Sequence, residues 1–190
     1  IQERIVGTEY VVNTISCKGK HVISDVWEYR RVNLGVEGTI YDRVVLITEL
    51  EPKHIELCEY ALQVADAMGI EYGPVHGEYM LDENGPVMIE CGARPMGGSM
   101  PASFLDKALG HHVTDICMDA YLNPEAFEVF AAKPYRPLCH AMMKFLIASR
   151  DRTIQDMPLN VIAQNLPSLH FSRLGALESA SEIDRTVALE

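Results

Sequence analysis

The sequence has 190 residues, of which 48% are hydrophobic and 23% are charged, and its formal net charge at pH 7 is −11. A chain of this length can bury a good core and make one domain or one and a half. The acidic balance argues against nonspecific nucleic-acid binding, which needs a basic surface to replace phosphate counterions. Small-molecule chemistry fits the composition better.

The cysteines also narrow the classes of protein to which the chain could belong. They number five, are widely spaced and include no C-x-x-C pair. Neither a disulfide framework nor a zinc site is indicated, so a reducing cytoplasm is the predicted location. The sequence also shows no internal repeat, signal peptide or transmembrane span, and no membrane partner is expected.

Two β-rich runs lie near the start of the chain. Residues 11–16 and 21–27 flank Gly19 and predict a hairpin. The second run continues into Arg30 and Arg31. These arginines would either reach a phosphate or a substrate carboxylate, or lie at a solvated strand end.

A helix follows the first strands. Pro52 predicts its start, Gly69 predicts its end, and apolar side chains recur between them at three-to-four spacing. The predicted core face consists of Ile55, Cys58, Leu62, Ala65 and Met68.

A second hairpin is predicted around the loop Glu83-Asn84-Gly85. A three-residue loop with Gly at its left-handed position is a common way to join antiparallel strands. The resulting register pairs Asp82 with Pro86, and therefore Glu78 with Glu90.

Side chains alternate across a strand, so this hairpin has two different faces. The face predicted to be core consists of Tyr79, Leu81, Val87, Ile89 and Cys91. The face predicted to carry chemistry consists of His76, Glu78, Met80, Met88 and Glu90.

The remaining elements are helical and then irregular. A helical region follows Ser99, is interrupted at Gly110 and resumes over residues 113–121. After it, Asn123-Pro124 and the stretch 134–137 predict a crossover, followed by an apolar strand at 138–147 and a turn at 150–152.

The paired glutamates of the hairpin predict a metal site. Like charges directly opposite each other destabilise a ladder by roughly 0.2–1 kcal/mol, so Glu78 and Glu90 need a cation, a shared proton or a basic partner. Mg²⁺ typically uses one or two carboxylates plus substrate phosphates. The alternative is a register slip by one residue, which leaves one Glu in solvent.

The residues that follow the hairpin favour the metal site. The planar guanidinium of Arg94 suits phosphate or carboxylate oxygens. Gly97 and Gly98 let the backbone approach a ligand before a helix whose free N–H groups favour an anion.

Two other groups of side chains invite a functional interpretation. His111 and His112 are adjacent, but neighbouring residues on a helix point in different directions, so a metal site there is not predicted. Cys91 follows Glu90 but is assigned to packing, because no His and Asn partners for thiol catalysis are identifiable.

The paired-carboxylate hairpin, the arginine and the double glycine resemble the final motif of the ATP-grasp superfamily, roughly H-x-E, a turn, then I-E-x-N-x-R-x-x-G-G. Residues 2–10 resemble the E-E-x-I-x-G-x-E segment of the same family. The resemblance covers residues 1–122 and is closest to the branch that joins carboxylates to amines, such as L-amino-acid ligases and carnosine-synthase-like enzymes.

The resemblance implies an α+β fold, the C-terminal half of an ATP-grasp domain with an antiparallel sheet and packed helices. Residues 1–122 would hold the nucleotide and metal site, and residues 123–190 would start a C-terminal α/β subdomain on the substrate side. Because the phosphate-gripping lysines of the upstream half are absent, the chain is predicted to be a segment of a longer enzyme and inactive by itself.

The resemblance also implies roles for matching residues, with ATP and Mg²⁺ or Mn²⁺ as cofactors. The nucleotide-binding residues would be Gln2, Glu3, Ile5 and Glu9, the metal ligands Glu78 and Glu90, and the catalytic residues Arg94, Gly97 and Gly98. His76, two residues before Glu78, suits the carboxylate–amine ligase branch of the family. Gly92 departs from the motif, because many members carry there an Asn whose amide oxygen serves a second Mg²⁺.

The predicted function is an ATP-dependent carboxylate–amine ligase that forms an amide or peptide bond through an acyl phosphate. Amino acids are the expected substrates, and a homo-oligomer is an open alternative to a monomer. Two other functions remain open: a carboxylase or carbamoyl-type enzyme that phosphorylates bicarbonate, and a nucleotide-binding module without catalysis.

Overall fold

The computed structural model describes residues 3–34, 38–98, 100–147, 152–153, 165–172 and 182–183. The chain divides into two compact units, Ile1–Arg30 with Arg43–Met143, and Arg31–Asp42 with Lys144–Glu190. Helices and an antiparallel sheet coexist in the first unit, which confirms the predicted α+β class.

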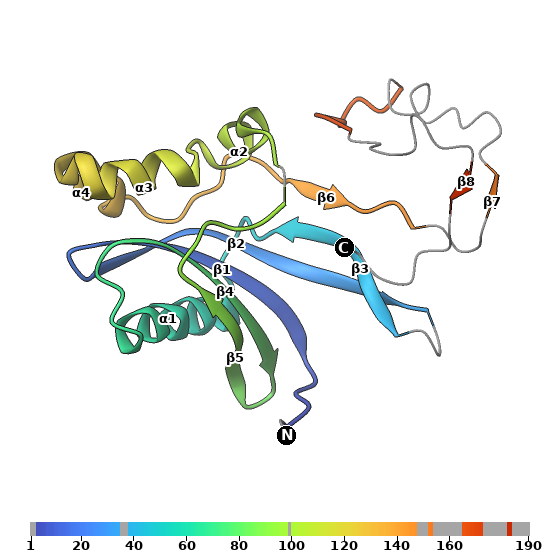
Figure 1. The fold of residues 1–190 in the computed structure, drawn as a ribbon, viewed down its shortest axis with the longest axis horizontal. Coiled ribbons are helices and arrows are strands. Elements are labelled where there is room, and N and C mark those ends of the chain that lie inside the picture. The colour runs from blue at the N-terminus through green and yellow to red at the C-terminus, as the bar shows by residue number, and fades with distance from the viewer. Residues whose placement is uncertain are drawn as a thin grey trace. The chain divides into compact units, whose positions relative to one another are not determined.

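The strands of the large sheet have the order β5-β4-β1-β2-β3-β6 (Figure 1). Their bounds are β1 Thr8–Cys17, β2 Lys20–Asn33, β3 Thr39–Leu46, β4 Gly73–Asp82, β5 Gly85–Gly92 and β6 Met142–Lys144. Strand β1 is central and pairs antiparallel with both β2 and β4, while β4 pairs antiparallel with β5. Segments far apart in sequence therefore lie side by side.

The first hairpin is confirmed. Its turn consists of Lys18 and Gly19, whose φ angles of 53° and 75° are both left-handed. Such a two-residue turn matches the twist of the strands that it joins. The β1–β2 register shifts after Asn13, which is paired with Asp25.

Helix α1, Pro52–Ala67, packs against one face of the sheet, which we call the α1 face. The core there contains Tyr10, Val12, Val26, Leu57, Cys58, Ala61 and Tyr79. The predicted helix is confirmed, but its buried stripe is rotated: His54 and Leu57 are buried, whereas Ile55 and Met68 are 46% and 48% exposed. His54 is buried despite its polarity because Nδ1 accepts a hydrogen bond from the backbone N–H of Glu51.

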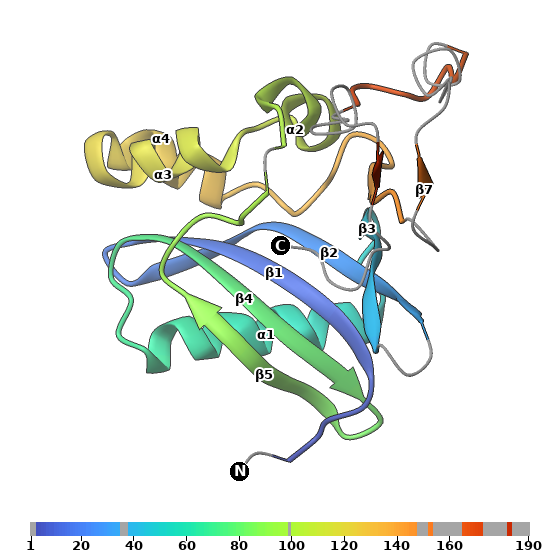
Figure 2. The same ribbon diagram turned by 45° about the vertical axis from the view of Figure 1, so that its right-hand side comes forward.

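Three helices, α2 Ala102–Leu109, α3 Val113–Leu122 and α4 Pro124–Ala131, lie on the other side of the sheet (Figure 2). Ile15 and Cys17 of β1 pack against Ile116 and Phe127 there. As predicted, Gly110 ends α2, with a left-handed φ of 77°.

Two predictions near this layer are wrong. The crossover predicted at Asn123-Pro124 is replaced by the start of α4, because the Asn123 side chain accepts a hydrogen bond from Ala126 N–H and proline suits the first turn of a helix. Its second part, 134–137, does lie outside helices and strands. The strand predicted at 138–147 is reduced to β6, Met142–Lys144. An apolar run alone does not fix strand length, because a strand needs a partner for its backbone hydrogen bonds.

The second unit includes β7, Arg152–Thr153, and β8, Glu182–Ile183, which form an antiparallel pair. In this unit the Arg31 guanidinium lies 4.4 Å from the centroid of the Tyr41 ring. The turn predicted at 150–152 lies mostly outside the described residues. The predicted division at residue 122 stays a prediction.

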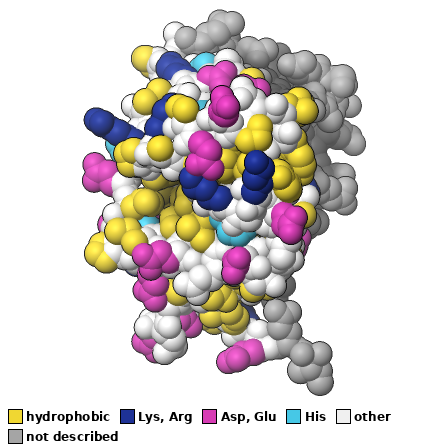
Figure 3. Space-filling view, turned by 90° about the vertical axis from the view of Figure 1, so that its left-hand side faces the viewer, with side chains coloured by type: hydrophobic (Ala, Val, Ile, Leu, Met, Phe, Trp, Pro, Cys, Tyr) yellow, Lys and Arg dark blue, Asp and Glu magenta, His cyan; other side chains and the backbone are white. Residues whose placement is uncertain are grey.

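Two observations concern the surface. On the face viewed in Figure 3, acidic, basic and apolar side chains are interspersed. None of the helices in the described part of the chain is both long and apolar enough to cross a membrane.

Candidate functional site

The second hairpin pairs Glu78 with Glu90, as predicted, but by a different route. Asp82 pairs with Gly85, not with Pro86, so the loop is one residue tighter than predicted. A register shift next to Tyr79, where Ile89 is the extra residue, then brings the two glutamates opposite each other. A β-bulge adds one residue to one strand, which cancels the shorter loop.

The bulge changes which side chains share a face. Directly opposed residues lie on the same side of a sheet, so Met88, opposite Tyr79, belongs to the α1 face, and Val87, opposite Met80, belongs to the other face. The predictions for Val87 and Met88 are therefore wrong. Ile89, predicted as core, is 39% exposed. Tyr79 and Leu81 do pack against the core of the α1 face.

The face opposite α1, which we call the site face, gathers polar side chains from four neighbouring strands. They are Glu9 and Asn13 on β1, Asp25 and Trp27 on β2, His76 and Glu78 on β4, and Glu90 on β5. Asn13 is paired with both Asp25 and His76, and Glu78 is paired with Glu90. Trp27 lies two residues from Asp25, and Glu9 stands opposite Met80, two residues from Glu78, so alternation keeps both on the same face. Seven side chains scattered over the sequence are thus brought to one surface.

A row of hydrogen bonds crosses the site face. His76 Nδ1 lies 2.8 Å from Asn13 Oδ1, and Asn13 Nδ2 donates to Asp25 Oδ1. The indole N–H of Trp27 donates to the same Asp25 oxygen. At the other end, His76 Nε2 lies 3.3 Å from Glu78 Oε1. The row connects Glu78 to the buried centre of the sheet and limits the freedom of its carboxylate.

Glu78 and Glu90 fit a hard cation that also has other ligands. The Glu78 side chain is 22% exposed and Glu90 is exposed, so both can be reached from solvent. Among the residues that the structure describes, no group of three or more His, Cys, Asp and Glu side chains could hold a metal ion. Two carboxylates suffice for Mg²⁺ when phosphate and water oxygens complete its shell.

The predicted nucleotide residues lie along β1 and the segment before it. Glu9 is 8% exposed and stands opposite Met80, two residues from Glu78 on the same face. Glu3 is exposed and Ile5 is half-buried. Gln2 lies outside the described residues.

Arg94 folds back over the glycines that flank it. Its Nη1 donates to the carbonyl of Pro95 at 3.0 Å, and the guanidinium is exposed. A Cβ at Gly97 would lie 3.8 Å from Nη1, and a Cβ at Gly92 would lie 3.5 Å from the Arg94 Cγ. Gly92 pairs with His76, so this position belongs to the site face, and a side chain there would make ordinary contact with Arg94.

A cavity of about 190 Å³ adjoins this segment. Asn13, Asp25 and Trp27 contribute to it from the sheet, and Gly97 and Gly98 from the loop. The helix predicted after the double glycine is confirmed, although α2 begins only at Ala102.

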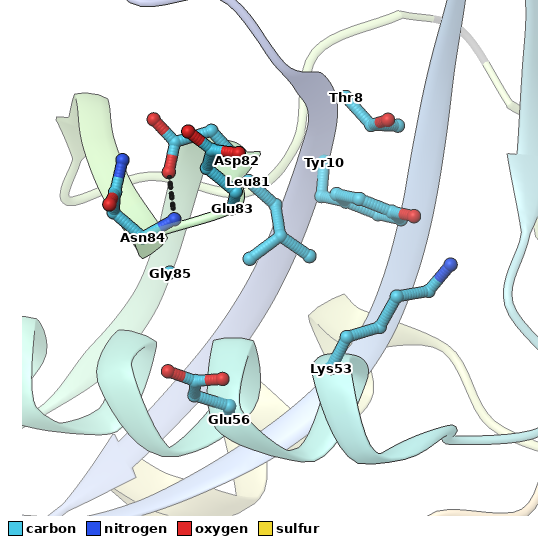
Figure 4. Close-up of a pocket in the computed structure, with 9 residues that line it drawn as sticks. All are labelled: Thr8, Tyr10, Lys53, Glu56, Leu81, Asp82, Glu83, Asn84 and Gly85. Carbon is cyan, nitrogen blue, oxygen red and sulfur yellow. Dashed lines mark hydrogen bonds between the residues drawn. The ribbon is translucent and has the colours of Figure 1, made fainter.

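A larger cavity of about 320 Å³ lies near the tip of the second hairpin (Figure 4). Tyr10 and Leu81 line it from the α1 face, and Lys53 and Glu56 point toward it from α1. The Asn84 N–H donates to Asp82 Oδ1 at 2.7 Å in its wall. Because Glu78 and Glu90 lie on the other face of the sheet, this cavity is separate from the predicted site.

The adjacent histidines His111 and His112 have different partners. His111 Nε2 lies 3.2 Å from Ser24 Oγ, and burial lowers the pKa of His111 below its ordinary value. His112 Nδ1 accepts from the Thr114 N–H and caps α3. Cys91 is half-buried, and burial raises the pKa of its thiol, which keeps it protonated and poorly nucleophilic.

Arg30 is held by its neighbour. Its Nε and Nη2 donate to the two carboxylate oxygens of Glu28 at 2.7 and 3.1 Å, and this pairing raises the pKa of Arg30. The Arg30 side chain is exposed near the end of β2, which agrees with the interpretation of Arg30 as part of a solvated strand end.

The sequence missed Asn13, Asp25 and Trp27 as parts of the site. A signal for them exists in the alternation of β1 and β2, where Asn13 interrupts the apolar positions Val11 and Ile15 on one face. A polar residue in the buried stripe of a central strand needs a hydrogen-bond partner, which predicts a polar neighbour on the next strand.

No family model matches the chain. The curated protein dapdiamide A synthase from Enterobacter agglomerans is 32% identical over 126 residues, which are 66% of this chain and 29% of that protein.

Solved structures agree on the fold. An L-amino acid ligase from Bacillus licheniformis superposes with a TM-score of 0.67 at 21% identity, over 84% of this chain and 40% of that one. An N5-carboxyaminoimidazole ribonucleotide synthetase in complex with ADP gives a TM-score of 0.54 at 16% identity, over 76% of this chain and 36% of that one. The chain thus spans well under half the length of each relative.

The sequence match and the superpositions agree that the chain has the fold of part of these ligases and synthetases, as its motifs predicted.

Proposed function

We propose that the chain is the nucleotide- and metal-binding part of an ATP-dependent carboxylate–amine ligase. The observation that carries the proposal is the pairing of Glu78 with Glu90 on the face that also holds Glu9. The likeness to a dapdiamide synthase and to an L-amino acid ligase supports amide formation with amino acids as substrates.

The nucleotide would lie across the site face. Gln2, Glu3 and Ile5 are proposed for the adenine edge, and Glu9 for the ribose hydroxyls. A structural neighbour solved with ADP supports a nucleotide as the ligand. Glu78 and Glu90 would hold Mg²⁺ or Mn²⁺, which neutralises phosphate oxygens when it is bound.

The proposed reaction has two steps. A carboxylate is a poor electrophile, so one of its oxygens first takes the γ-phosphoryl group of ATP, and ADP leaves. The amine nitrogen then attacks the carbonyl carbon of the acyl phosphate, loses a proton and displaces phosphate. The protein contributes alignment and charge neutralisation, which dominate catalysis of phosphoryl transfer.

Arg94 is proposed to neutralise the reacting carboxylate or the acyl phosphate, and Gly97 and Gly98 to offer backbone contacts. The guanidinium is solvent-accessible, and its Pro95 bond uses one of its donors. A guanidinium carries five N–H donors, so others remain for an anion.

The test is the dependence of ADP release on the second substrate in the full-length protein. Release that needs an amino-acid pair would support the ligase. Release that needs bicarbonate would support the carboxylase or carbamoyl-type alternative, and nucleotide binding without release would support a non-catalytic module.

The partners are proposed to be small-molecule carboxylates and amines, with neither nucleic acid nor membrane. The cytoplasm is the proposed location, because the odd set of scattered cysteines suits a reducing compartment.

A further inference from the structure

Asp25 lines the 190 Å³ cavity on the site face, and one of its carboxylate oxygens is buried without a hydrogen-bond partner among the described residues. Asp25 is 2% exposed, and its Oδ1 accepts from both Asn13 Nδ2 and the Trp27 indole. Its Oδ2 has no hydrogen-bond partner within the described part of the chain. A buried carboxylate without full pairing is costly, so a site that keeps one invites a cationic partner.

The lining fits a small cation with an apolar body. Apart from Asp25, the described lining carries no formally charged Asp, Glu, Lys or Arg side chain, and Trp27, Met96, Met100, Leu105 and Val113 supply apolar surface. The volume is below the roughly 300–1,000 Å³ of pockets for drug-sized ligands. A metal ion is a poor candidate, since a single unpaired carboxylate oxygen offers too few ligands.

The positive charge of Arg94 lies at the margin of the cavity. Gly97 lines the cavity, and a Cβ on it would lie 3.8 Å from Arg94 Nη1. A carboxylate at one side and a guanidinium at another match an α-amino acid, which carries an ammonium and a carboxylate on one carbon.

We propose that Asp25 is a specificity-determining residue, whose Oδ2 binds the α-ammonium group of the amino acid whose carboxylate faces Arg94. Asn13 and Trp27 hold Oδ1 and so aim the carboxylate. This inference rests on the proposed function, since the carboxylate at Arg94 would be the one that is activated.

The experiment uses Trp27, the only tryptophan in the chain, as the reporter. Its indole N–H donates to Asp25, so its fluorescence and its indole NMR signal respond to a ligand on that carboxylate. The protein is titrated, without ATP or metal, with L-valine and with N-acetyl-L-valine, which lacks the ammonium group. L-valine is expected to shift the signal, and the acetylated form to bind about tenfold more weakly or worse.

Asp25→Asn is the test variant, because it keeps an oxygen for Asn13 and Trp27 and removes the charge. It should weaken L-valine binding by about tenfold or more, while its melting temperature holds or rises because a buried charge is gone. Glu59→Gln is the matched control, since this exposed carboxylate lies on α1 and its loss should leave binding unchanged.

In the full-length protein, Asp25→Asn should raise KM for the amino acid about tenfold and leave KM for ATP unchanged. Equal binding of the two valine probes, no signal change with either, or unchanged affinity in Asp25→Asn would overturn the inference. Its failure is distinct from failure of the ligase proposal, because the titration needs no turnover, and ADP release is measured separately.

Discussion

The two faces of the sheet differ in what their side chains do, although the same strands supply both. On the α1 face, Tyr10, Val12 and Tyr79 pack with Leu57 in an apolar core. On the site face, Asn13, Asp25 and His76 are equally buried but are joined by hydrogen bonds. One face stabilises the fold, and the other keeps polar groups in place at some cost to stability, which is typical of functional sites. Substitutions on the two faces should therefore separate stability from activity.

Leu57→Ala should have the largest effect on stability. Leu57 is fully buried on the α1 face, and removing a buried leucine side chain typically costs about 2–5 kcal/mol. Denaturant unfolding measures this loss. A cost under about 1 kcal/mol would mean that the α1 face is not the main core.

Glu90→Gln should have the largest effect on activity with little on stability. Removing a preorganised charge from the reacting site should lower turnover about a hundredfold or more. The melting temperature should hold or rise, because the repulsion between Glu78 and Glu90 is relieved. Turnover near wild type at saturating Mg²⁺ and ATP would remove Glu90 from the metal site.

Arg94→Lys should lower activity by roughly ten- to a hundredfold, which corresponds to the loss of a charge-assisted hydrogen bond of about 1.5–3 kcal/mol. Lysine keeps the charge but lacks the planar fork. Steady-state kinetics in the full-length protein measures the change. Full activity in the lysine variant would reduce Arg94 to a general electrostatic role.

Gly77 lies on the α1 face of the second hairpin and Gly92 on the site face, so substituting each with alanine compares the two faces. A Cβ at Gly77 would lie 2.3 Å from the Tyr79 hydroxyl oxygen and 2.6 Å from its ring, so Gly77→Ala should cost about 1–3 kcal/mol. Gly92→Ala meets Arg94 at an ordinary 3.5 Å and should change stability by less than about 0.5 kcal/mol. Comparable unfolding free energies for the two variants would contradict the packing of Tyr79 over Gly77.

The smallest effect expected is a pH dependence of stability. Burial lowers the pKa of His54 below its ordinary 6.5, so between these two values the unfolded chain binds more protons. Stability should therefore fall as pH drops below about 6.5 toward the folded-state pKa. His54→Gln should flatten this decline, with the remainder due to His111, whose pKa is shifted the same way. An unchanged profile in the variant would exclude His54 as a source.

Much of the candidate site was predictable because it depends on short-range patterns. The spacing of Glu78, Glu90 and Arg94 is local to one hairpin and its exit. Alternation from the predicted loop assigns the two glutamates to one face, an outcome that the structure reaches through a tighter loop and a bulge. Gly19 and Gly110 marked turns because their left-handed φ angles suit glycine. The family motif added the nucleotide residues, whose roles remain proposals.

The sequence by itself determined the order of elements, the turns and the two carboxylates, because these follow from residue periods and from backbone conformations that few residues adopt. Only the tertiary structure decided the bulge at Ile89, the rotated stripe of α1 and the row from His76 to Asp25. Each of these depends on which segment lies beside which, and residues far apart in the chain set that choice by packing and by satisfying buried polar groups.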